Sequence, residues 1–200
     1  MDSSLFQWFN RFADRTTWAH GPIRLYADYG IIVFAGLLLV AFLGSRHRND
    51  VRGVAGSLWA GAAALVALGA GQLIGNAVGR ARPYETLANV HVLIDRTTDF
   101  SFPSDHATAV GAVAVGLLLV QRRLGLIAVV AAIAMALSRV YVGAHYPLDV
   151  LAGLVLGGTV AFAGARLLVR VLERVLRRVA ASPAGIIVAA NAAAVAEAVP

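Results

Sequence analysis

The chain has 200 residues, of which 59% are hydrophobic and only 14% are charged, and its mean hydropathy is +0.74. This composition is typical of a membrane protein and argues against a soluble bundle in which the same apolar segments form a buried core. The formal net charge of +6 comes from arginine alone, but the arginines are scattered between apolar segments, which argues against nucleic acid as a partner.

The N-terminal segment, residues 1–15, is rich in aromatic side chains and contains acidic residues but no central apolar run. It therefore lacks the pattern of a cleavable signal peptide. Aromatic side chains here and just after it suit the headgroup layer of a membrane, namely Trp8, Phe9, Phe12 and Trp18. We predict an N-terminal interfacial segment.

Residues 54–79 carry no charged side chain and are long enough to cross a hydrocarbon core, which needs about 20 residues of helix. Four further segments are apolar but somewhat short, or interrupted by a polar residue near one end. They cover residues 29–45, 106–121, 124–142 and 149–169. The sequence thus predicts an all-α, polytopic transmembrane helix bundle with about five spans, which forms one membrane-embedded domain over residues 1–183.

The chain that follows the fifth predicted span is first amphipathic and then alanine-rich. In residues 166–180 arginine recurs every three or four positions, a pattern that favours a helix lying against anionic lipid over a helix that binds a protein partner. Residues 184–200 form an apolar tail. This tail is shorter than a full span and contains Asn191 and Glu197, so a sixth crossing is left open but is not favoured.

The arginines are divided unequally between the two sides of the predicted bundle. Ten lie on one side: Arg46, Arg48, Arg52, Arg122, Arg123, Arg166, Arg170, Arg174, Arg177 and Arg178. The other seven are Arg11, Arg15, Arg24, Arg80, Arg82, Arg96 and Arg139. The positive-inside rule places the first side in the cytoplasm of a bacterial-type cell. Three polar strings then face the extracytoplasmic side: Arg82-Pro83, FPSDH at residues 102–106 and SRVYVGAHYPLD at residues 138–149.

The second string predicts a phosphate-binding helix start. Ser104 stands in an N-cap position just before an apolar run that begins near Ala107. The backbone amides of the first turn, including that of Asp105, would then be unpaired donors able to bind phosphate oxygens. For this string alone, a simple cap at Ser104 and a headgroup-level position for His106 are equally acceptable.

The third string adds a histidine, a carboxylate and a guanidinium. Pro147 fits a first helical turn, which would let the Asp149 carboxylate reach back to a ring nitrogen of His145 and leave the other nitrogen free to attack. Arg139, at the end of the preceding span, could hold two oxygens of one phosphoryl group. Separately, Asp149 could serve the helix dipole and Arg139 could snorkel. Their coincidence on one side of a membrane favours function, because ionisable groups are costly there.

Together the strings resemble the signature of the type 2 phosphatidic acid phosphatase superfamily over residues 55–165. The family's pattern of serine-arginine, five residues, histidine, three residues and aspartate is met in full from Ser138 to Asp149. The resemblance implies a lipid phosphatase that needs no cofactor and works through a phosphohistidine. It implies that His145 is the nucleophile, Asp149 its orienter and His106 the general acid, and that Arg82, Ser104 and Arg139 hold the phosphate.

Two positions depart from the family pattern. Gly75 stands where the family usually has a lysine, seven residues before Arg82, and Arg80 could supply the missing charge. Asp105 stands where the broad family usually has glycine, which is similar to the bacitracin-resistance subgroup, the undecaprenyl pyrophosphate phosphatases. The Asp105 side chain could point away from phosphate, bond Arg80 or Arg82, or discriminate between head groups.

The expected substrate is a polyprenyl pyrophosphate of the undecaprenyl type. A lipid monoester such as phosphatidate or phosphatidylglycerophosphate is the second choice. An anion transporter is disfavoured because few polar residues lie at the middle of the predicted spans. A metal site is an alternative, because four residues of types that bind metal ions occur within fifteen positions: His91, Asp95, Asp99 and Asp105. A thiolate metal site is excluded because the chain has no cysteine. We expect no metal, because the arginines already supply positive charge. The sequence gives no oligomeric state.

Overall fold

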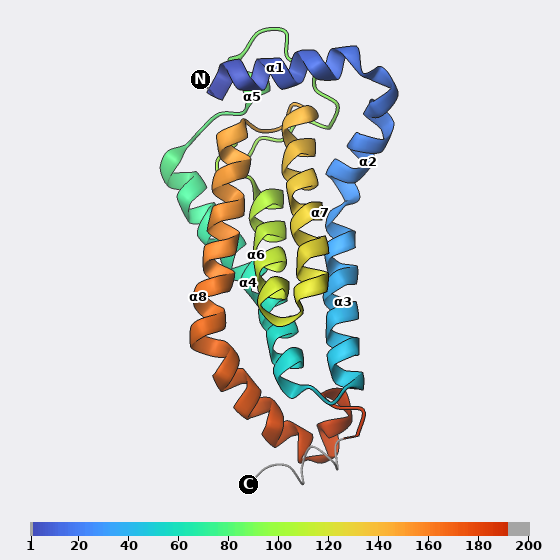
Figure 1. Ribbon diagram of the computed structural model, residues 1–200. Helices are drawn as coiled ribbons and strands as arrows, with labels where there is room; N and C mark the ends of the chain where they lie inside the picture. The colour runs from blue at the N-terminus through green and yellow to red at the C-terminus, as the bar shows by residue number, and fades with distance from the viewer. Residues whose placement is uncertain (1, 192–200) are drawn as a thin grey trace.

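The computed structural model describes residues 2–191 and is built of helices throughout, with no strand in that range (Figure 1). The prediction of an all-α helix bundle is therefore confirmed. The five long helices of the bundle form where the five apolar segments predict them. They are α3 (Ile31–His47), α4 (Val51–Val78), α6 (Asp105–Val120), α7 (Arg122–Tyr141) and α8 (Pro147–Ala180).

The bundle helices differ in how far they can reach across a bilayer. Within the described chain, α4, α7 and α8 are long and apolar enough to span a membrane. A fourth candidate is a bent pair, in which Thr17–Tyr29 meets α3 at 53°, and α2 (His20–Tyr29) forms most of its first arm. Helix α6 has 16 residues and so reaches only about 24 Å. It lies at the centre of the bundle and packs against α4, α7 and α8.

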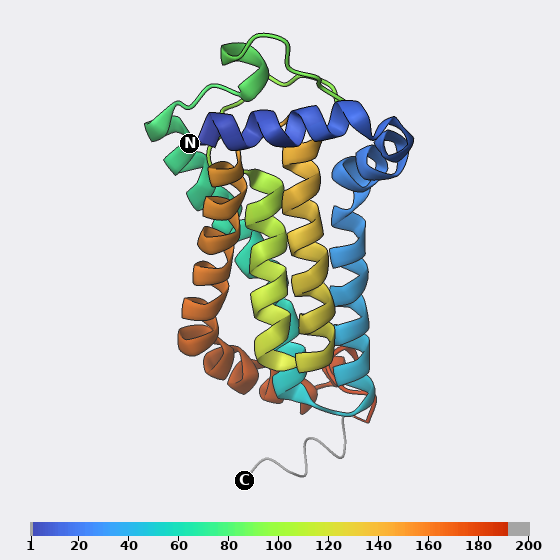
Figure 2. The same cartoon turned by 45° about the horizontal axis from the view of Figure 1, so that its top comes forward.

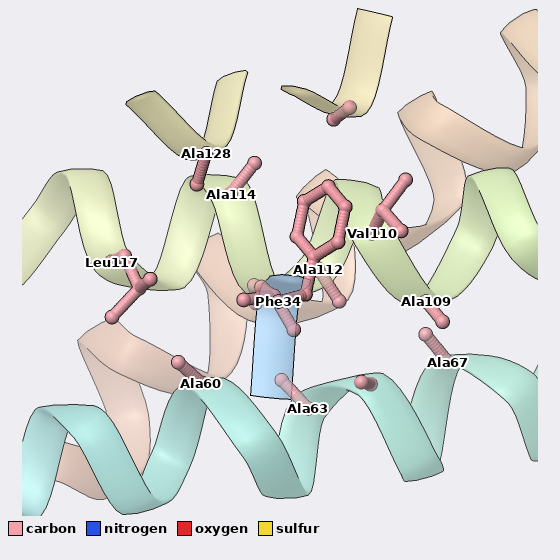
Figure 3. Packing of buried hydrophobic residues seen from close by; sticks show 14 of the residues in the cluster. Phe34, Ala60, Ala63, Ala67, Ala109, Val110, Ala112, Ala114, Leu117 and Ala128 are labelled. Atoms are coloured by element: carbon pink, nitrogen blue, oxygen red, sulfur yellow. The ribbon is translucent and has the colours of Figure 1, made fainter. Parts of the chain in front are cut away.

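Small side chains let these backbones approach α6 closely. Alanines of α4, including Ala60, Ala63 and Ala67, lie beside alanines and valines of α6 (Figure 3). A Cβ atom at Gly153 of α8 would meet the carbonyl oxygen of Ser104 at only 2.6 Å. The close approach that glycine allows brings the second turn of α8 against the start of α6, as small residues do in packed membrane helices.

Helix α1 (Asp2–Arg15) lies across one end of the bundle, as Figures 1 and 2 show. Its buried face carries Phe6, Asn10 and Ala13, whereas Trp8 is 56% exposed. The short helix η1 (Thr17–Ala19) joins it to α2, and Trp18 there is 81% exposed. This arrangement is the one expected of an interfacial segment with aromatic side chains at the headgroup level.

The opposite end of the molecule is closed by the second half of α8, which continues the helix through the amphipathic segment. Its last turn packs with the start of α4 and with Ala189, and η2 (Pro183–Ile187) follows it. The Arg46 guanidinium donates to the carbonyl of Ile186 at 2.6 and 2.8 Å. The division into a domain and a tail after residue 183 stays a prediction, because residues 192–200, most of that tail, lie outside the described residues.

The three polar strings meet at the α1 end. They lie in the segment between α4 and α6, which includes α5 (Pro83–Thr86), and in the short connection between α7 and α8. The arginine-rich turns between α3 and α4 and between α6 and α7 lie at the other end (Figure 1). The fold thus gathers the candidate chemistry under α1.

Candidate active site

His145 lies in the connection before α8 and is 2% exposed. Its Nδ1 atom is 2.8 Å from the carbonyl oxygen of Ser101, and its Nε2 atom is 3.3 Å from Nη1 of Arg82. A carbonyl oxygen can only accept and a guanidinium can only donate, so Nδ1 carries the proton and the Nε2 lone pair accepts from Arg82. This is the tautomer that an attacking Nε2 atom requires.

The surroundings of His145 keep its ring uncharged. Burial lowers the pKa of His145 well below its ordinary value, and the positive charges of Arg82 and Arg139 lower it further. At neutral pH His145 is therefore a neutral imidazole, the nucleophilic form.

Asp149 and His145 are not joined by a hydrogen bond, so the expected direct bond between them is wrong. One carboxylate oxygen accepts from Ser101 Oγ at 2.6 Å and from the Tyr146 backbone N–H at 3.0 Å. The other accepts from Arg80 at 2.5 Å. Asp149 is the third residue of α8, where a carboxylate turns back onto the amide that precedes the helix. Asp149 is thus linked to His145 through Ser101 and through the backbone amide of Tyr146, the next residue.

Ser101 is a site residue that the sequence reasoning missed. Its hydroxyl donates to Asp149, its carbonyl accepts from His145, and its own N–H donates to the carbonyl of Arg80 at 2.8 Å. The residue is fully buried. The available signal was a serine immediately before the FPSDH string, between two phenylalanines. A hydroxyl in such surroundings needs a partner in the fold.

Arg82 is 4% exposed and points its guanidinium at the free nitrogen of His145. It also donates to the carbonyl of Ala144 at 3.1 Å and to the Asp99 carboxylate at 2.8 Å. Burial alone would raise the pKa of Asp99, but the hydrogen bonds from Thr97 and Arg82 lower it below the ordinary value. The pair with Asp99 therefore fixes the guanidinium in place.

Arg139, near the end of α7, is 6% exposed. One of its terminal nitrogens donates to the carbonyl of Ala27 in α2 at 3.0 Å. Its Nε atom has no hydrogen-bond partner, the one buried side-chain nitrogen or oxygen among the described residues of which this is true. A buried guanidinium N–H without a partner is costly. It is a donor suited to an anionic oxygen beside His145.

The start of α6 is capped as the sequence predicts. Ser104 is the N-cap residue, and its hydroxyl accepts from the Ala107 N–H at 3.5 Å. The Ser104 N–H donates to the backbone carbonyl of Asp149 at 3.1 Å, which ties the second string to the third. Asp105 and His106 occupy the first turn, where backbone N–H groups lack helical partners.

The two departures from the family pattern lie on the α4 side. The Asp105 carboxylate accepts from the Gln72 side chain at 2.8 Å, so it bonds neither Arg80 nor Arg82. It lines a cavity of about 130 Å³ together with Gly75 and Asp99. The backbone of Asp105 remains a predicted phosphate donor.

Arg80 is paired with carboxylates in the structure, and its expected phosphate contact stays a prediction. Its guanidinium is held by the carboxylates of Asp149 and Asp2, the latter at 2.6 Å. It also lies over the ring of Tyr146, 4.0 Å from the ring centre. The Arg80 guanidinium is thus bound by two carboxylates and by one aromatic ring.

The four residues proposed as an alternative metal site do not form one cluster, although Asp99 and Asp105 line the same cavity. His91 lies 3.3 Å from the Asp14 carboxylate, whereas Asp99 pairs with Arg82 and Asp105 with Gln72. Across residues 2–191, no group of three histidine, aspartate or glutamate side chains is arranged to hold a metal ion.

A family model and two curated relatives match this chain over most of its bundle. The family model of the PAP2 superfamily matches residues 56–173, more than half of the chain. The undecaprenyl-diphosphatase BcrC of Bacillus subtilis is 31% identical over 168 residues, which cover 78% of this chain and 83% of the relative. The decaprenylphosphoryl-5-phosphoribose phosphatase of Mycobacterium tuberculosis is 42% identical over 130 residues, 62% of this chain and 67% of the relative.

One solved structure has the same fold. It is the transmembrane PAP2-type phosphatidylglycerolphosphate phosphatase of Bacillus subtilis, with a TM-score of 0.59 and 22% sequence identity. The match covers 86% of this chain and 84% of that one.

Proposed function

The chain belongs to the PAP2 superfamily and is a multi-pass membrane phosphatase, and we propose that it hydrolyses a polyprenyl pyrophosphate of the undecaprenyl type to the monophosphate. The observation that carries the proposal is the Nε2 atom of a buried His145 lying against Arg82, with the unpaired Arg139 N–H nearby. The Bacillus subtilis relative named as an undecaprenyl-diphosphatase supports this substrate. Asp105 supports it as well, because an aspartate at this position resembles the undecaprenyl pyrophosphate phosphatase subgroup. Phosphatase relatives favour an enzyme over the anion transporter.

Substrate binding would begin with the two arginines. A terminal phosphate oxygen accepts from Arg82, which frees the lone pair of His145 Nε2, and a second oxygen accepts from Arg139 Nε. Backbone amides at the start of α6, after Ser104, are further donors. Guanidinium groups suit this task because their N–H donors match the spacing of phosphate oxygens.

The chemical steps are a double displacement. His145 Nε2 attacks phosphorus, the bond from phosphorus to the bridging oxygen breaks, and His106 donates a proton to that oxygen. The Nδ1 proton stays hydrogen-bonded to Ser101. Water then attacks the phosphohistidine while His106 accepts a proton from it, and inorganic phosphate leaves. The arginines stabilise the charge on the equatorial oxygens in both steps.

The reaction is proposed to need no metal ion. Phosphoryl transfer requires positive charge close to the transferred group, and the buried pair of Arg82 and Arg139 would supply it permanently. The carboxylates nearby are committed elsewhere, Asp99 to Arg82 and Asp105 to Gln72.

A lipid monoester is the second candidate substrate. It is favoured by the 42% identity to the Mycobacterium tuberculosis protein named as a decaprenylphosphoryl-5-phosphoribose phosphatase. That name describes a polyprenyl lipid whose head group carries a terminal phosphate monoester. The same arginines and His145 would serve it, but its leaving group is an alkoxide instead of a phosphate.

Phosphate release by purified protein tests both proposals. We expect kcat/KM to be highest for undecaprenyl pyrophosphate in a panel with undecaprenyl phosphate, phosphatidate, phosphatidylglycerophosphate and decaprenylphosphoryl-5-phosphoribose, and to be unchanged by EDTA. A higher value for a monoester would replace the first candidate with the second. Loss of activity in EDTA with recovery in magnesium would refute metal independence.

We further propose that the site faces the extracytoplasmic side, because the arginine-rich turns lie at the far end of the bundle. The chain has no cysteine, so single cysteine variants are unambiguous probes. Thr98→Cys, in the exposed segment before α6, should react with an impermeant thiol reagent added to intact cells. Arg123→Cys, in the first turn of α7, should react only after lysis. The reverse pattern would overturn the orientation.

A further inference from the structure

One face of α1 rests directly on the loops of the active site. Asp2, Phe6 and Asn10 are four residues apart and so share that face. Phe6 packs edge-on against Tyr146, the residue after His145, with ring centres 5.5 Å apart. Asn10 bonds the backbone of His91 twice, accepting from its N–H and donating to its carbonyl.

A second face of α1 carries exposed apolar side chains. Leu5, Trp8 and Phe12 are 48%, 56% and 48% exposed, respectively. These side chains suit the headgroup layer, where an interfacial helix buries one apolar face. Figure 2 shows α1 lying across the ends of the bundle helices, on the side of the loop that joins α4 to α6.

Asp2 makes the most specific contact of this face. One oxygen of its carboxylate accepts from Arg80 at 2.6 Å, and the other accepts from the Leu148 backbone N–H at 3.1 Å. Leu148 is the second residue of α8 and precedes Asp149. One carboxylate thus holds both Arg80 and the helical turn that carries Asp149, and only 14% of its side chain is exposed.

Hydrogen bonds run without a break from Asp2 to the proposed nucleophile. Arg80 donates to Asp2 and Asp149 from its two terminal nitrogens, at 2.6 and 2.5 Å. Ser101 Oγ donates to Asp149 at 2.6 Å, and the Ser101 carbonyl accepts from His145 at 2.8 Å. Each member is held on both sides, so a displacement at one end is transmitted along the chain.

We propose that Asp2 is a positioning residue for His145, and that α1 is consequently part of the active site as well as an interfacial helix. The inference rests on the proposed nucleophilic role of His145. Without the Asp2 carboxylate, one side of the Arg80 guanidinium loses its partner and the first turn of α8 loses an acceptor. Asp149 and Ser101 then hold the His145 ring less firmly, and a smaller fraction of molecules presents Nε2 in line with phosphorus.

The consequence is a defect in kcat and not in KM. Arg82 and Arg139, which are proposed to hold the phosphate, form no side-chain hydrogen bond with Asp2 or Arg80. Substrate binding should therefore be retained when Asp2 is replaced. We expect Asp2→Ala to lower kcat about tenfold, within the range that coupled polar neighbours show. Asp2→Glu, which keeps the carboxylate, should restore most of the loss.

Asp14→Ala is the matched control, because Asp14 is an exposed carboxylate of the same helix that pairs with His91. It should leave kcat near the wild-type value. The assay uses full-length protein in lipid nanodiscs and whichever lipid of the panel above the wild type hydrolyses fastest. Failure of the pyrophosphate proposal therefore does not affect this test.

A double-mutant cycle with Ser101→Ala separates positioning from a general loss of stability. Ser101→Ala removes the hydroxyl that joins Asp149 to the residue holding His145. If Asp2 acts through this chain, Asp2→Ala should lower kcat far less in the Ser101→Ala background than in the wild type. Equal losses in the two backgrounds, an unchanged kcat in Asp2→Ala, or no rescue by Asp2→Glu would overturn the inference.

Discussion

His145→Ala is expected to lower kcat by about 10⁴-fold or more, because no other group replaces a deleted nucleophile. Three features of the structure motivate this expectation: His145 is buried, its pKa is lowered and its Nε2 atom lies 3.3 Å from the arginine proposed to bind phosphate. The loss should be the same for every lipid substrate. Phosphate release from a pyrophosphate and from a monoester measures it.

The fold should survive this change. The bundle core consists of alanines, valines and a few larger side chains at a distance from His145, such as Phe34 and Leu117. Gel filtration and thermal unfolding should therefore resemble the wild type. His47→Ala, at the arginine-rich end of α3, is the matched control and should retain full activity. Substantial turnover by the His145→Ala variant would exclude His145 as the nucleophile.

His106→Ala is expected to separate the two substrate classes. A lipid alkoxide is a poor leaving group and needs a proton in the transition state, a contribution of about 10²- to 10⁴-fold in rate. A lipid phosphate that leaves from a pyrophosphate needs little such help. Hydrolysis of phosphatidate should therefore fall far more than hydrolysis of undecaprenyl pyrophosphate, measured as kcat/KM.

The comparison depends on kcat/KM because that quantity covers the steps up to the first irreversible one. His106 is proposed to act again as a base in the second step, so kcat alone would mix the two roles. Equal losses of kcat/KM for both substrates would mean that His106 positions phosphate and does not protonate the leaving group.

Most of the fold could be predicted because the signals are local. Apolar runs locate all five helices of the bundle, and Ser104 followed by an apolar run correctly predicts the start of α6. Aromatic side chains near the N-terminus predict an interfacial segment. Even the short α6 is found, since its composition and its cap do not depend on its surroundings.

The hydrogen bonds of the site could not be predicted, because they join distant parts of the chain. The spacing of His145 and Asp149 suggests a direct bond, but Ser101, more than forty residues earlier, lies between them. Arg80 is close in sequence to Arg82, which is proposed to bind phosphate, yet it bonds Asp2 and Asp149. A buried charged side chain can have several possible partners, and packing decides which of them it bonds. The local sequence pattern does not contain this information.

The most direct test of the account is the site of the covalent phosphate. His106→Ala should accumulate the phosphoenzyme when undecaprenyl pyrophosphate is added, because attack needs little acid help while hydrolysis of the intermediate loses its base. Rapid quenching in alkali, in which phosphohistidine is stable, followed by mass spectrometry of the peptides locates the group. The account predicts phosphate on His145. Phosphate on any other residue, or turnover with no enzyme-bound phosphate, would contradict it.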